Sequence, residues 1–591
     1  MSVEIVLGKG INFDAPASEL ELGVPCGDTK NVRFANGMAE SFEGSYAEIS
    51  ASVDPYWAEL YQPSSAILLV YGGSARVYSY DQAGGTHTQI TRYTDGVTIS
   101  TITYVTTTAT LTTSSAHGLS TGNTVTVYLA SPSAYNGTFS ITVTGATTFT
   151  YTMASDPGAN ATTVGAYSYD VQSDFTSAVA QTSAVKLSGG VFNGTLLYNN
   201  PHDGLYYWNG DTSTRLRKVP TSYKADASKP FRSFIVQIAP TISGTKYPLD
   251  VVWSTSTEPG AIPTSFVGSS TNDAGRFPLA ETGGPLLDLL QMGEQMLLYK
   301  RDAIFSMRYT GGDAVFAFQK LPGAEGVFSP RCVVDTPVGH VFLSASVDVR
   351  IHTGGESRSI ADGTVRKWLR ENINTFSNGS RCACLTVLPN KSEVWVCIPQ
   401  DSATGAPNSV LVWNWISQTW SFFKVGTTGA TDGVFGYTRG FFPVLGAARD
   451  QRDVGLFVTG GGGKIAVMTG QASATPGLFL GSSLTAVIEF KGLHFGKRDR
   501  MKSVERTRWN FDSASGAGSV TVKHGSSKFA DTAPSYATGA TYTIGTTDWA
   551  CSRGTQGRFG AIHATWATNA SGSPYILRTL DVDGPTWGGL R

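Results

Sequence analysis

Residues 67–80 read ILLVYGGSARVYSY: an apolar run, a Gly72-Gly73 turn, and a second apolar run that ends in aromatic residues. Two short apolar runs on either side of a tight turn are typical of paired antiparallel strands. The same theme returns along the chain, at residues 196–208, 296–307, 341–351, 394–413 and 456–468. Because radially repeated hairpins leave only short sheet edges, this repetition favours an irregular β-propeller-like body. A stack of separate β-sandwiches is the competing architecture.

Residues 97–170 interrupt the repeat with a segment of different composition, which holds 21 threonines and no lysine or arginine. Apolar residues and threonines alternate in runs such as Thr124–Tyr128, and Asn136-Gly137 is a strong hairpin-turn signal. The segment is predicted to be a small β-sandwich inserted between two strands of the body. Its ends, near Val97 and Asp170, are therefore expected to lie close together.

The remaining sequence divides into the body and two terminal regions, and the whole chain is predicted to be all-β. Residues 61–96 and 171–474 form the propeller-like body, and residues 475–591 form a C-terminal β-sandwich. Residues 1–60 show little periodicity and are expected to wrap other elements or subunits. One short helix is predicted at Val365–Asn372, where apolar residues recur at helical spacing.

The composition narrows the class of protein. Only 15% of the 591 residues are charged, against roughly 25% in ordinary soluble proteins. Lysine and arginine number 44 and the acids 45, which excludes a globally basic nucleic-acid binder and favours association with other subunits. The six cysteines are scattered, so no disulfide framework is expected. No secretory signal begins the sequence, and no apolar run approaches the ~20 residues of a membrane span.

Three motifs resemble reactive sites but lack the context that such sites need. Gly118–Gly122 matches the nucleophile pattern G-x-S-x-G around Ser120, but a strand is expected after it where that motif needs a helix. Cys382 and Cys384 are spaced too closely for a usual zinc site and have no second pair. The glycine run before Lys464 lacks the Walker spacing. We interpret these motifs as a turn, core residues and a hairpin.

No catalytic residue, cofactor site or metal site is predicted, and the chain is not expected to be an enzyme. The eight histidines show no metal-ligand spacing. His340 and His352 flank a hairpin, where neighbouring structural histidines are expected. Carboxylates are numerous, but no sequence feature selects the two that a glycosidase would need.

The sharpest charge feature is the segment Lys491–Arg508, which holds seven bases and two acids. Residues 1–60 hold ten acids and three bases. In a head-to-tail ring such complementary patches can meet between subunits and weaken with salt. A solvated loop and direct DNA contact are the alternatives for the basic segment. The candidate subunit-interface residues are Lys497, Arg498, Arg500, Lys502 and Arg506.

Several stretches resemble one family of virus proteins. The opening KGINFDAP at residues 9–16 and NVRFANG at residues 31–37 look like the start of tail nozzle (tail tubular) proteins of short-tailed bacteriophages. The central runs LLYK at residues 297–300, IFSM at 304–307 and VFLS at 341–344 are also similar. The threonine-rich insert resembles small β-domains that are spliced into many phage virion proteins.

The resemblance implies a structural virion protein in the tail, assembled in the host cytoplasm. It implies a homo-hexameric ring with a tail adaptor ring above, and fibres or spikes beside or below. Double-stranded DNA would pass through the channel without sequence-specific binding, and the ring would face the host envelope at infection. Since each neutralised phosphate adds affinity, a chain with few bases suits a conduit that must release DNA.

Two other classes of function stay open at this stage. One is a receptor- or carbohydrate-binding tail protein, for which Tyr206-Tyr207-Trp208 and Trp413-Asn414-Trp415 are candidate sugar platforms. The other is a propeller glycosidase or depolymerase. Glycan binding without ring formation would favour the first, and release of reducing sugar would favour the second.

Overall fold

The computed structural model describes residues 2–591 with gaps at 43–46, 64–66, 82–83, 173, 176–186, 220–222, 313, 374–382, 401–406, 425–433, 444–451, 461–462, 469–477, 480–481, 497–499, 505, 513–517, 552–555, 568–574, 584–585 and 589–591. Short strands joined by turns fill the described chain, and the predicted all-β fold is confirmed. One α-helix, α1 (Arg366–Asn372), occurs in the described part, where the spacing of apolar residues places it. Two 3₁₀ turns cover Ser133–Tyr135 and Pro389–Lys391.

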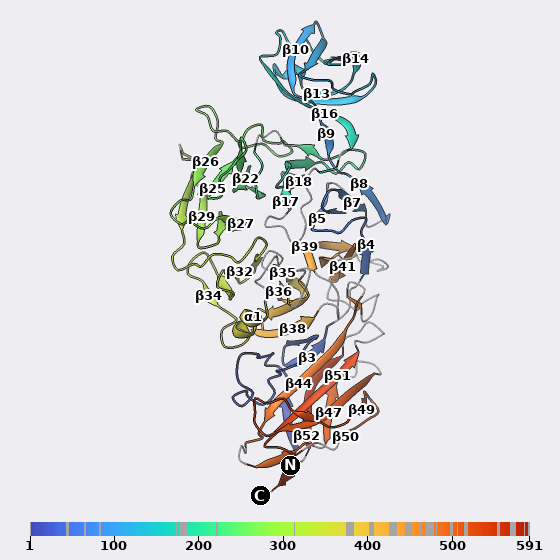
Figure 1. Cartoon of the computed structure of the whole chain (residues 1–591), viewed down its shortest axis with the longest axis vertical. Helices are drawn as coiled ribbons and strands as arrows, with labels where there is room; N and C mark the ends of the chain where they lie inside the picture. Colours follow the sequence, from blue (N-terminus) through green and yellow to red (C-terminus); the bar gives the residue numbers. More distant parts are fainter. Residues whose placement is uncertain are drawn as a thin grey trace. The chain divides into compact units, whose positions relative to one another are not determined.

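The chain forms two compact units. Unit 1 comprises Met1–Leu60, Ala180–Lys186 and Thr282–Arg591, and unit 2 comprises Tyr61–Val179 and Leu187–Glu281. Each unit is built from small antiparallel sheets (Figure 1).

Seven four-stranded antiparallel meanders follow one another along the described chain. Meanders 1 to 3 are β5 (Trp57–Tyr61), β6 (Leu68–Gly72), β7 (Val77–Asp81), β8 (Thr86–Gln89); β17 (Ser188–Phe192), β18 (Thr195–Asn200), β19 (Gly204–Trp208), β20 (Arg217–Lys218); and β21 (Ala227–Phe231), β22 (Phe234–Ile238), β25 (Asp250–Trp253), β26 (Gly275–Pro278). A side hairpin of β23 (Thr241–Ile242) and β24 (Thr245–Lys246) interrupts the third.

Meanders 4 to 7 belong to unit 1. They are β27 (Leu286–Met292), β28 (Gln295–Lys300), β29 (Ile304–Tyr309), β30 (Phe316–Lys320); β31 (Val333–Thr336), β32 (Gly339–Leu343), β33 (Val349–His352), β34 (Arg358–Ser359); β35 (Cys384–Leu388), β36 (Glu393–Ile398), β37 (Ser409–Asn414), β38 (Thr419–Lys424); and β39 (Val434–Pro443), β40 (Arg452–Gly460), β41 (Lys464–Met468), β4 (Ala47–Ser50). The last strand of meander 7, β4, thus comes from the start of the chain, and Ile49 pairs with Ile465.

The inserted segment folds as two four-stranded sheets in unit 2. They are β10 (Ile99–Val105), β11 (Thr108–Thr113), β15 (Thr148–Thr152), β14 (Thr142–Gly145), and β13 (Gly137–Ser140), β12 (Thr124–Ser131), β16 (Thr163–Gln172), β9 (Tyr93–Asp95). One apolar core lies between them, with Leu111, Val125 and Phe149 fully buried. The two ends lie side by side as predicted, because Asp95 pairs with Ser168 and the Gly96 N–H donates to the Tyr167 carbonyl at 2.7 Å.

The adjacent ends lead to the first testable expectation. A chain in which a short Gly-Ser bridge replaces residues 98–168 is expected to keep unit 1 and the meanders of unit 2 folded, since the insert has its own core. Circular dichroism and thermal unfolding of the purified variant test this. Loss of all soluble protein would contradict it and would make the segment part of the main core.

The N-terminal segment, residues 2–42, supplies strands to sheets whose other members lie far along the chain. Strands β1 (Ser2–Val6) and β3 (Met38–Ser41) pair with β52 (Ile576–Asp583), and β2 (Val32–Ala35) pairs with β38. Meander 6 thereby continues into a ten-stranded sheet, whose further strands are β46 (Arg506–Phe511) and β50 (Ala550–Cys551).

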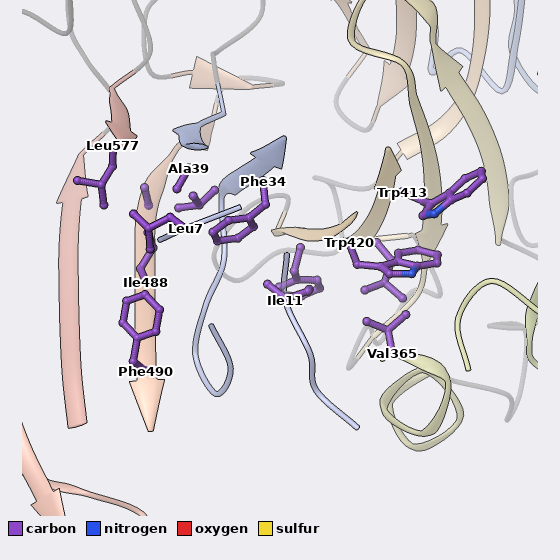
Figure 2. Packing of buried hydrophobic residues seen from close by; sticks show 14 of the residues in the cluster. Leu7, Ile11, Phe34, Ala39, Val365, Trp413, Trp420, Ile488, Phe490 and Leu577 are labelled. Carbon is purple, nitrogen blue, oxygen red and sulfur yellow. The ribbon is translucent and has the colours of Figure 1, made fainter. Parts of the chain in front are cut away.

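The C-terminal region contributes strands β46, β50 and β52 to the ten-stranded sheet and also forms a second sheet, and residues of both lie in one hydrophobic core. The second C-terminal sheet contains β44 (Thr485–Leu493), β51 (Phe559–Ala567), β47 (Ser519–Ser527), β48 (Ser535–Tyr536) and β49 (Ala540–Thr543). Short pairs join β42 (Leu478–Phe479) to β43 (Ser482–Ser483) and β45 (Met501–Ser503) to β53 (Thr586–Gly588). Figure 2 shows the core that all these parts share: Leu7 and Phe34 from the N-terminal segment, Trp420 from meander 6, and Ile488 and Leu577 from the two C-terminal sheets.

Candidate functional site

The five candidate interface bases do not form one exposed patch in this structure. Lys497 and Arg498 lie outside the described residues. Arg500 is exposed just before β45. Arg506, on β46, is half exposed but already pairs with Asp583, and its guanidinium lies 5.1 Å from the ring centre of Trp549. Its charge is therefore balanced within its own chain.

Lys502 is buried, with 1% of its surface exposed. Its ammonium donates to the backbone carbonyls of Arg500 at 2.8 Å and Arg558 at 2.6 Å, and lies over the Phe559 ring. Because a buried lysine needs these acceptors, Lys502 ties the start of β45 to the start of β51 and is not free to meet a partner. The expectation that it belongs to a surface patch needs this correction.

The acidic N-terminal segment and the basic segment nevertheless meet, inside one chain. Loop residues 26–30 lie along β44, where the Cys26 N–H donates to the Glu489 carbonyl at 2.9 Å. The Lys30 N–H and carbonyl make a reciprocal pair with Val487. The loop thus adds a short strand-like edge to the second C-terminal sheet. The base of the basic segment that lies here, Lys491, pairs with Glu489 of its own strand.

Glu489 is the centre of this docking site, with only 4% of its surface exposed. Its carboxylate accepts from the Asp28 N–H at 2.6 Å and from the Tyr536 hydroxyl at 2.6 Å, and pairs with the Lys491 ammonium at 3.1 Å. A buried carboxylate is stable only when donors surround it in this way. At Gly27 (φ +64°) any Cβ would collide with the Glu489 carboxylate and the Lys491 ammonium, so the loop needs glycine there.

The pKa values around Glu489 fit docking more readily than catalysis. Burial, with the nearby Glu489 charge, raises the pKa of the Tyr536 hydroxyl above its usual range. Burial also raises the pKa of the Cys26 thiol to about 11, so this cysteine stays protonated and unreactive at neutral pH. Interaction with His563, 3.9 Å away, lowers the pKa of Asp28. The shifts keep the Tyr536 hydroxyl protonated, as its hydrogen bond to Glu489 needs, and the Asp28 carboxylate ionised beside His563 and Lys30.

The stretch that resembles nozzle proteins, residues 9–16, binds to meander 6 and to helix α1 with the loop before it. The Ile11 N–H donates to the Trp420 carbonyl at 2.9 Å, and Gly10 (φ +71°) allows this close approach. The Phe13 ring packs on Trp368 and Phe422, with ring centres 5.4 and 5.9 Å away. These residues connect the N-terminal segment to the body.

Asp14 caps helix α1 from a distant part of the sequence. Its two carboxylate oxygens accept the Lys367 and Trp368 N–H groups, each at 2.9 Å. The residue before the helix, Val365, has no side-chain oxygen for this task. Asp14 therefore satisfies two free N–H groups and places a negative charge at the positive end of the helix.

Replacing Asp14 by alanine is expected to cost about 1–2 kcal/mol of stability, because both N–H groups lose their acceptor. Hydrogen exchange of the Lys367 and Trp368 amides measures the effect directly. Asp14→Asn, which keeps one acceptor oxygen, should lose less. Equal, unchanged exchange in both variants would contradict the capping role.

Arg33 and Glu393 form a buried ion pair between β2 and β36. Their exposed fractions are 2% and 0%, and the guanidinium binds both carboxylate oxygens. The Trp395 indole N–H donates to the same carboxylate at 3.0 Å, and Arg33 lies over the Phe42 ring at 4.5 Å. This pair fixes the join between the N-terminal segment and meander 6. The sequence analysis missed it, although an acid inside the apolar run at Glu393–Ile398 is a signal for a paired buried charge.

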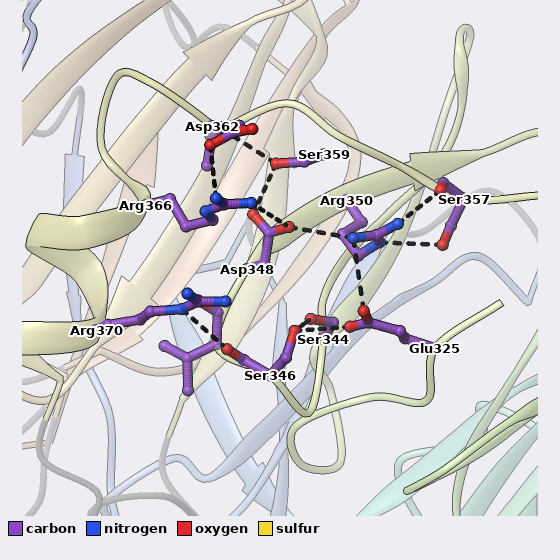
Figure 3. A network of polar contacts seen from close by, with 12 residues as sticks. Glu325, Ser344, Ser346, Asp348, Arg350, Ser357, Ser359, Asp362, Arg366 and Arg370 are labelled. Atoms are coloured by element: carbon purple, nitrogen blue, oxygen red, sulfur yellow. Dashed lines mark hydrogen bonds and ion pairs between the residues drawn. The ribbon is translucent and has the colours of Figure 1, made fainter. Parts of the chain in front are cut away.

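A second polar network closes meander 5 (Figure 3). Asp348, 1% exposed, accepts from the Ser359 hydroxyl at 2.8 Å and pairs with Arg350 at 3.2 Å and with Arg366 of α1 at 3.9 Å. Glu325 pairs with the same Arg350 at 3.6 Å. Burial opposes ionisation of Glu325, but hydrogen bonds from Ser346 and Ser344 lower its pKa overall. An ionised, arginine-paired acid is not the general acid of a glycosidase.

His340 and His352 are neighbours, as expected, and share the hydroxyl of Tyr299. That oxygen lies 2.7 Å from His340 Nδ1 and 3.0 Å from His352 Nε2. The Gly354 N–H donates to His352 Nδ1, and His340 Nε2 lies 3.1 Å from the Gln291 carbonyl. All four contacts are satisfied if both rings are neutral. His352 Nε2 then donates to the Tyr299 oxygen, the Tyr299 hydroxyl donates to His340 Nδ1, and His340 Nε2 donates to the Gln291 carbonyl. Both histidines are buried structural residues of meander 5, and Tyr299 reaches them from meander 4.

The three motifs that resemble reactive sites lie in ordinary turns and strands wherever the structure describes them. Ser120 is exposed in a turn before β12, a strand. Cys384 lies opposite Cys397 on the neighbouring strand, and a hydrogen bond with Cys384 together with burial raises the pKa of Cys397. Cys382 lies outside the described residues. Lys464 follows the β40–β41 hairpin turn. These placements agree with the structural interpretation of each motif.

Of the aromatic residues offered as sugar platforms, all are buried except Tyr207, which is partly buried. Tyr206, Trp208 and Trp413 are each 1% exposed and Trp415 is 9% exposed. Their rings pack within the meanders, so the sequence-based platform hypothesis is wrong for these residues.

The described residues also lack two other kinds of functional feature. No group of three or more histidine, cysteine, aspartate or glutamate side chains lies close enough to hold a metal ion there. No described helix has the length and apolar character of a membrane span.

Comparisons with known proteins give no family. No family model matches the chain, and no curated protein matches it. Among solved structures, a chain of the mitotic checkpoint complex matches with a TM-score of 0.33 at 10% identity, over 72% of this chain and 95% of that chain.

Two other solved structures are comparably distant. Saccharomyces cerevisiae Sqt1 matches with a TM-score of 0.27 at 8% identity, over 48% of this chain and 95% of its own. The phage phi92 endosialidase matches with a TM-score of 0.19 at 11% identity, over 71% of this chain and 75% of its own. No TM-score here reaches 0.5, so these likenesses say nothing about the role of the chain.

Proposed function

We propose that this chain is a structural virion protein, the subunit of a ring that forms the distal tail tube, or nozzle, of a short-tailed phage. The ring is homo-hexameric, carries the genome channel, and is a platform for the adaptor ring and for fibres or spikes. The chain has no enzymatic role in this proposal. It is incorporated into the virion tail after assembly in the host cytoplasm.

One observation carries the proposal: the nozzle-like opening of the sequence is the part that joins the body to the C-terminal sheets. Residues 9–16 bind meander 6 and helix α1 with the loop before it, Phe34 lies in the shared core, and Arg33 is buried. The residues behind the resemblance thus hold the fold together, as expected of a structural subunit. The seven meanders, the last completed by β4, also have the strand order of propeller blades closed by a terminal strand.

Electron microscopy of the purified chain tests the ring. Six-fold rings with a central opening are expected, and a label on this subunit should lie at the distal end of the tail in whole particles. A monomer that binds purified host glycans, or that releases reducing sugar from them, would replace this proposal with one of the two alternatives.

The electrostatic part of the ring contact needs variants that spare Lys502, since that residue is buried. Arg500→Glu with Arg508→Glu changes two exposed positions of the basic segment, and exposed Lys528→Glu is the matched control. Slower ring assembly at low salt in the first variant alone is expected. Sedimentation across a salt series measures it, and equal assembly of all three proteins would make the segment a solvated loop.

A further inference from the structure

Arg92 lies at the root of the inserted sandwich, just before β9, and 10% of its side chain is exposed. It contacts both strands that connect the insert to the body. On the incoming side its Nη1 lies 3.8 Å from the Asp95 carboxylate. On the outgoing side its Nη2 donates to the Asp174 carbonyl at 3.2 Å, and its guanidinium lies 5.3 Å from the Phe175 ring centre.

The same guanidinium also reaches meander 2. Nη1 donates to the Tyr206 hydroxyl at 2.9 Å and lies 3.7 Å from the Asp203 carboxylate, which is 5% exposed. Lys218, on the last strand of meander 2, pairs with Asp95 at 3.4 Å. Two bases and two acids therefore balance at the root, and one side chain touches three separate segments.

Two backbone hydrogen bonds also hold the root of the insert, and neither involves Arg92. The Tyr93 N–H donates to the Leu216 carbonyl at 3.1 Å, and the Phe175 N–H donates to the Ala75 carbonyl at 2.9 Å. A two-stranded ribbon alone would bend, because it has no core of its own at the junction. A planar guanidinium that binds several acceptors at once resists that bending.

We propose that Arg92 locks the inserted sandwich in a fixed direction on meander 2, so that the insert is a rigid projection and not a freely tethered domain. A projection held in this way meets a partner without first losing orientational freedom, which lowers the cost of binding. The lock is independent of the nozzle proposal, since it depends only on contacts within unit 2.

Hydrogen exchange of the full-length chain tests the lock. In Arg92→Ala the root amides of Tyr93, Gly96 and Phe175 are expected to exchange at least about tenfold faster than in the wild type, while amides in the insert core, such as Leu111, stay unchanged. Lys246→Ala removes an exposed pair with Asp226 elsewhere in unit 2 and is the matched control, with no change expected at the root.

Anisotropy decay of a dye at the exposed turn residue Val105 gives the second readout. The labelled chain carries Val105→Cys and Cys551→Ser, because Cys551 is the exposed thiol among the described residues. Arg92→Ala should add a fast component that the wild type lacks. Identical root exchange and identical anisotropy in the two proteins would overturn the lock.

A third variant covers the case in which Arg92→Ala unfolds meander 2 by leaving Asp203 buried without its partner. Tyr206→Phe removes a single hydroxyl and keeps the ring. Faster exchange confined to the root in this variant supports the lock, and wild-type exchange at the root overturns it.

Discussion

A chain in which alanine replaces Glu393 is expected to lose about 3–5 kcal/mol of stability in unit 1. The substitution leaves Arg33, which is 2% exposed, as a buried charge without its main partner. Glu40 lies 3.9 Å from Arg33 and already pairs with Lys391 at 3.3 Å, so it does not replace the carboxylate at the guanidinium. The Trp395 indole N–H loses its acceptor as well.

Urea unfolding followed by tryptophan fluorescence measures this loss. Glu21→Ala removes the acid of an exposed pair with Lys9 and should leave the unfolding midpoint unchanged. Replacing Arg33 and Glu393 together by methionine and leucine should restore most of the stability, because no charge then stays buried. If Glu393→Ala were as mild as Glu21→Ala, the ion pair would not hold the join between β2 and β36.

Acidification is expected to destabilise unit 1 by about 3 kcal/mol between pH 7 and pH 4 through His352 alone. Burial, with His340 nearby, lowers the pKa of His352 to about 4, against about 6.5 in an unfolded chain. Between these two values the unfolded chain binds a proton that the folded chain does not bind. Stability is therefore complete above pH 6.5 and is lost as the pH falls toward 4.

The geometry explains why folded His352 does not bind a proton between pH 6.5 and pH 4. A charged His352 would carry a hydrogen on Nδ1, where the Gly354 N–H already donates at 3.2 Å. Urea unfolding at pH 7 and pH 5 should give a smaller pH difference for His352→Gln than for the wild type, by about 2 kcal/mol. His202→Gln changes an exposed histidine of unit 2 and is the control, for which the pH dependence of unit 1 should stay that of the wild type. An undiminished difference in His352→Gln would exclude this imidazole as the cause.

The sequence predicted the hairpins of the body well. Six apolar repeats correspond to the central strand pairs of meanders 1, 2, 4, 5, 6 and 7, since these strands carry short apolar runs on either side of a turn. Meander 3 was not predicted from the apolar repeat, because residues 239–249, with their own small hairpin, replace a tight turn between β22 and β25. The outer strands are short and partly exposed, so their patterns are weak.

The docking of the N-terminal segment was not predictable in detail. Asp14, Arg33 and Glu489 each bind a partner that lies hundreds of residues away in the sequence. A local pattern can show that a charge lies in an apolar run, but it cannot name the partner. The acidic and basic segments were visible in the sequence, but the docking of loop residues 26–30 on β44, the strand that leads into the basic segment, was not.

The pairing of β1 with β52 has a consequence for folding during synthesis on the ribosome. Ribosomes add residues at about 5–20 per second, so the first strand of this chain waits on the order of a minute before its partner exists. During that time β2, β3 and β4 also lack their sheets, and their unpaired edges are open to wrong neighbours. A chaperone that holds the first 50 residues should therefore raise the yield of correctly folded chains, while one that acts only after release should do so less.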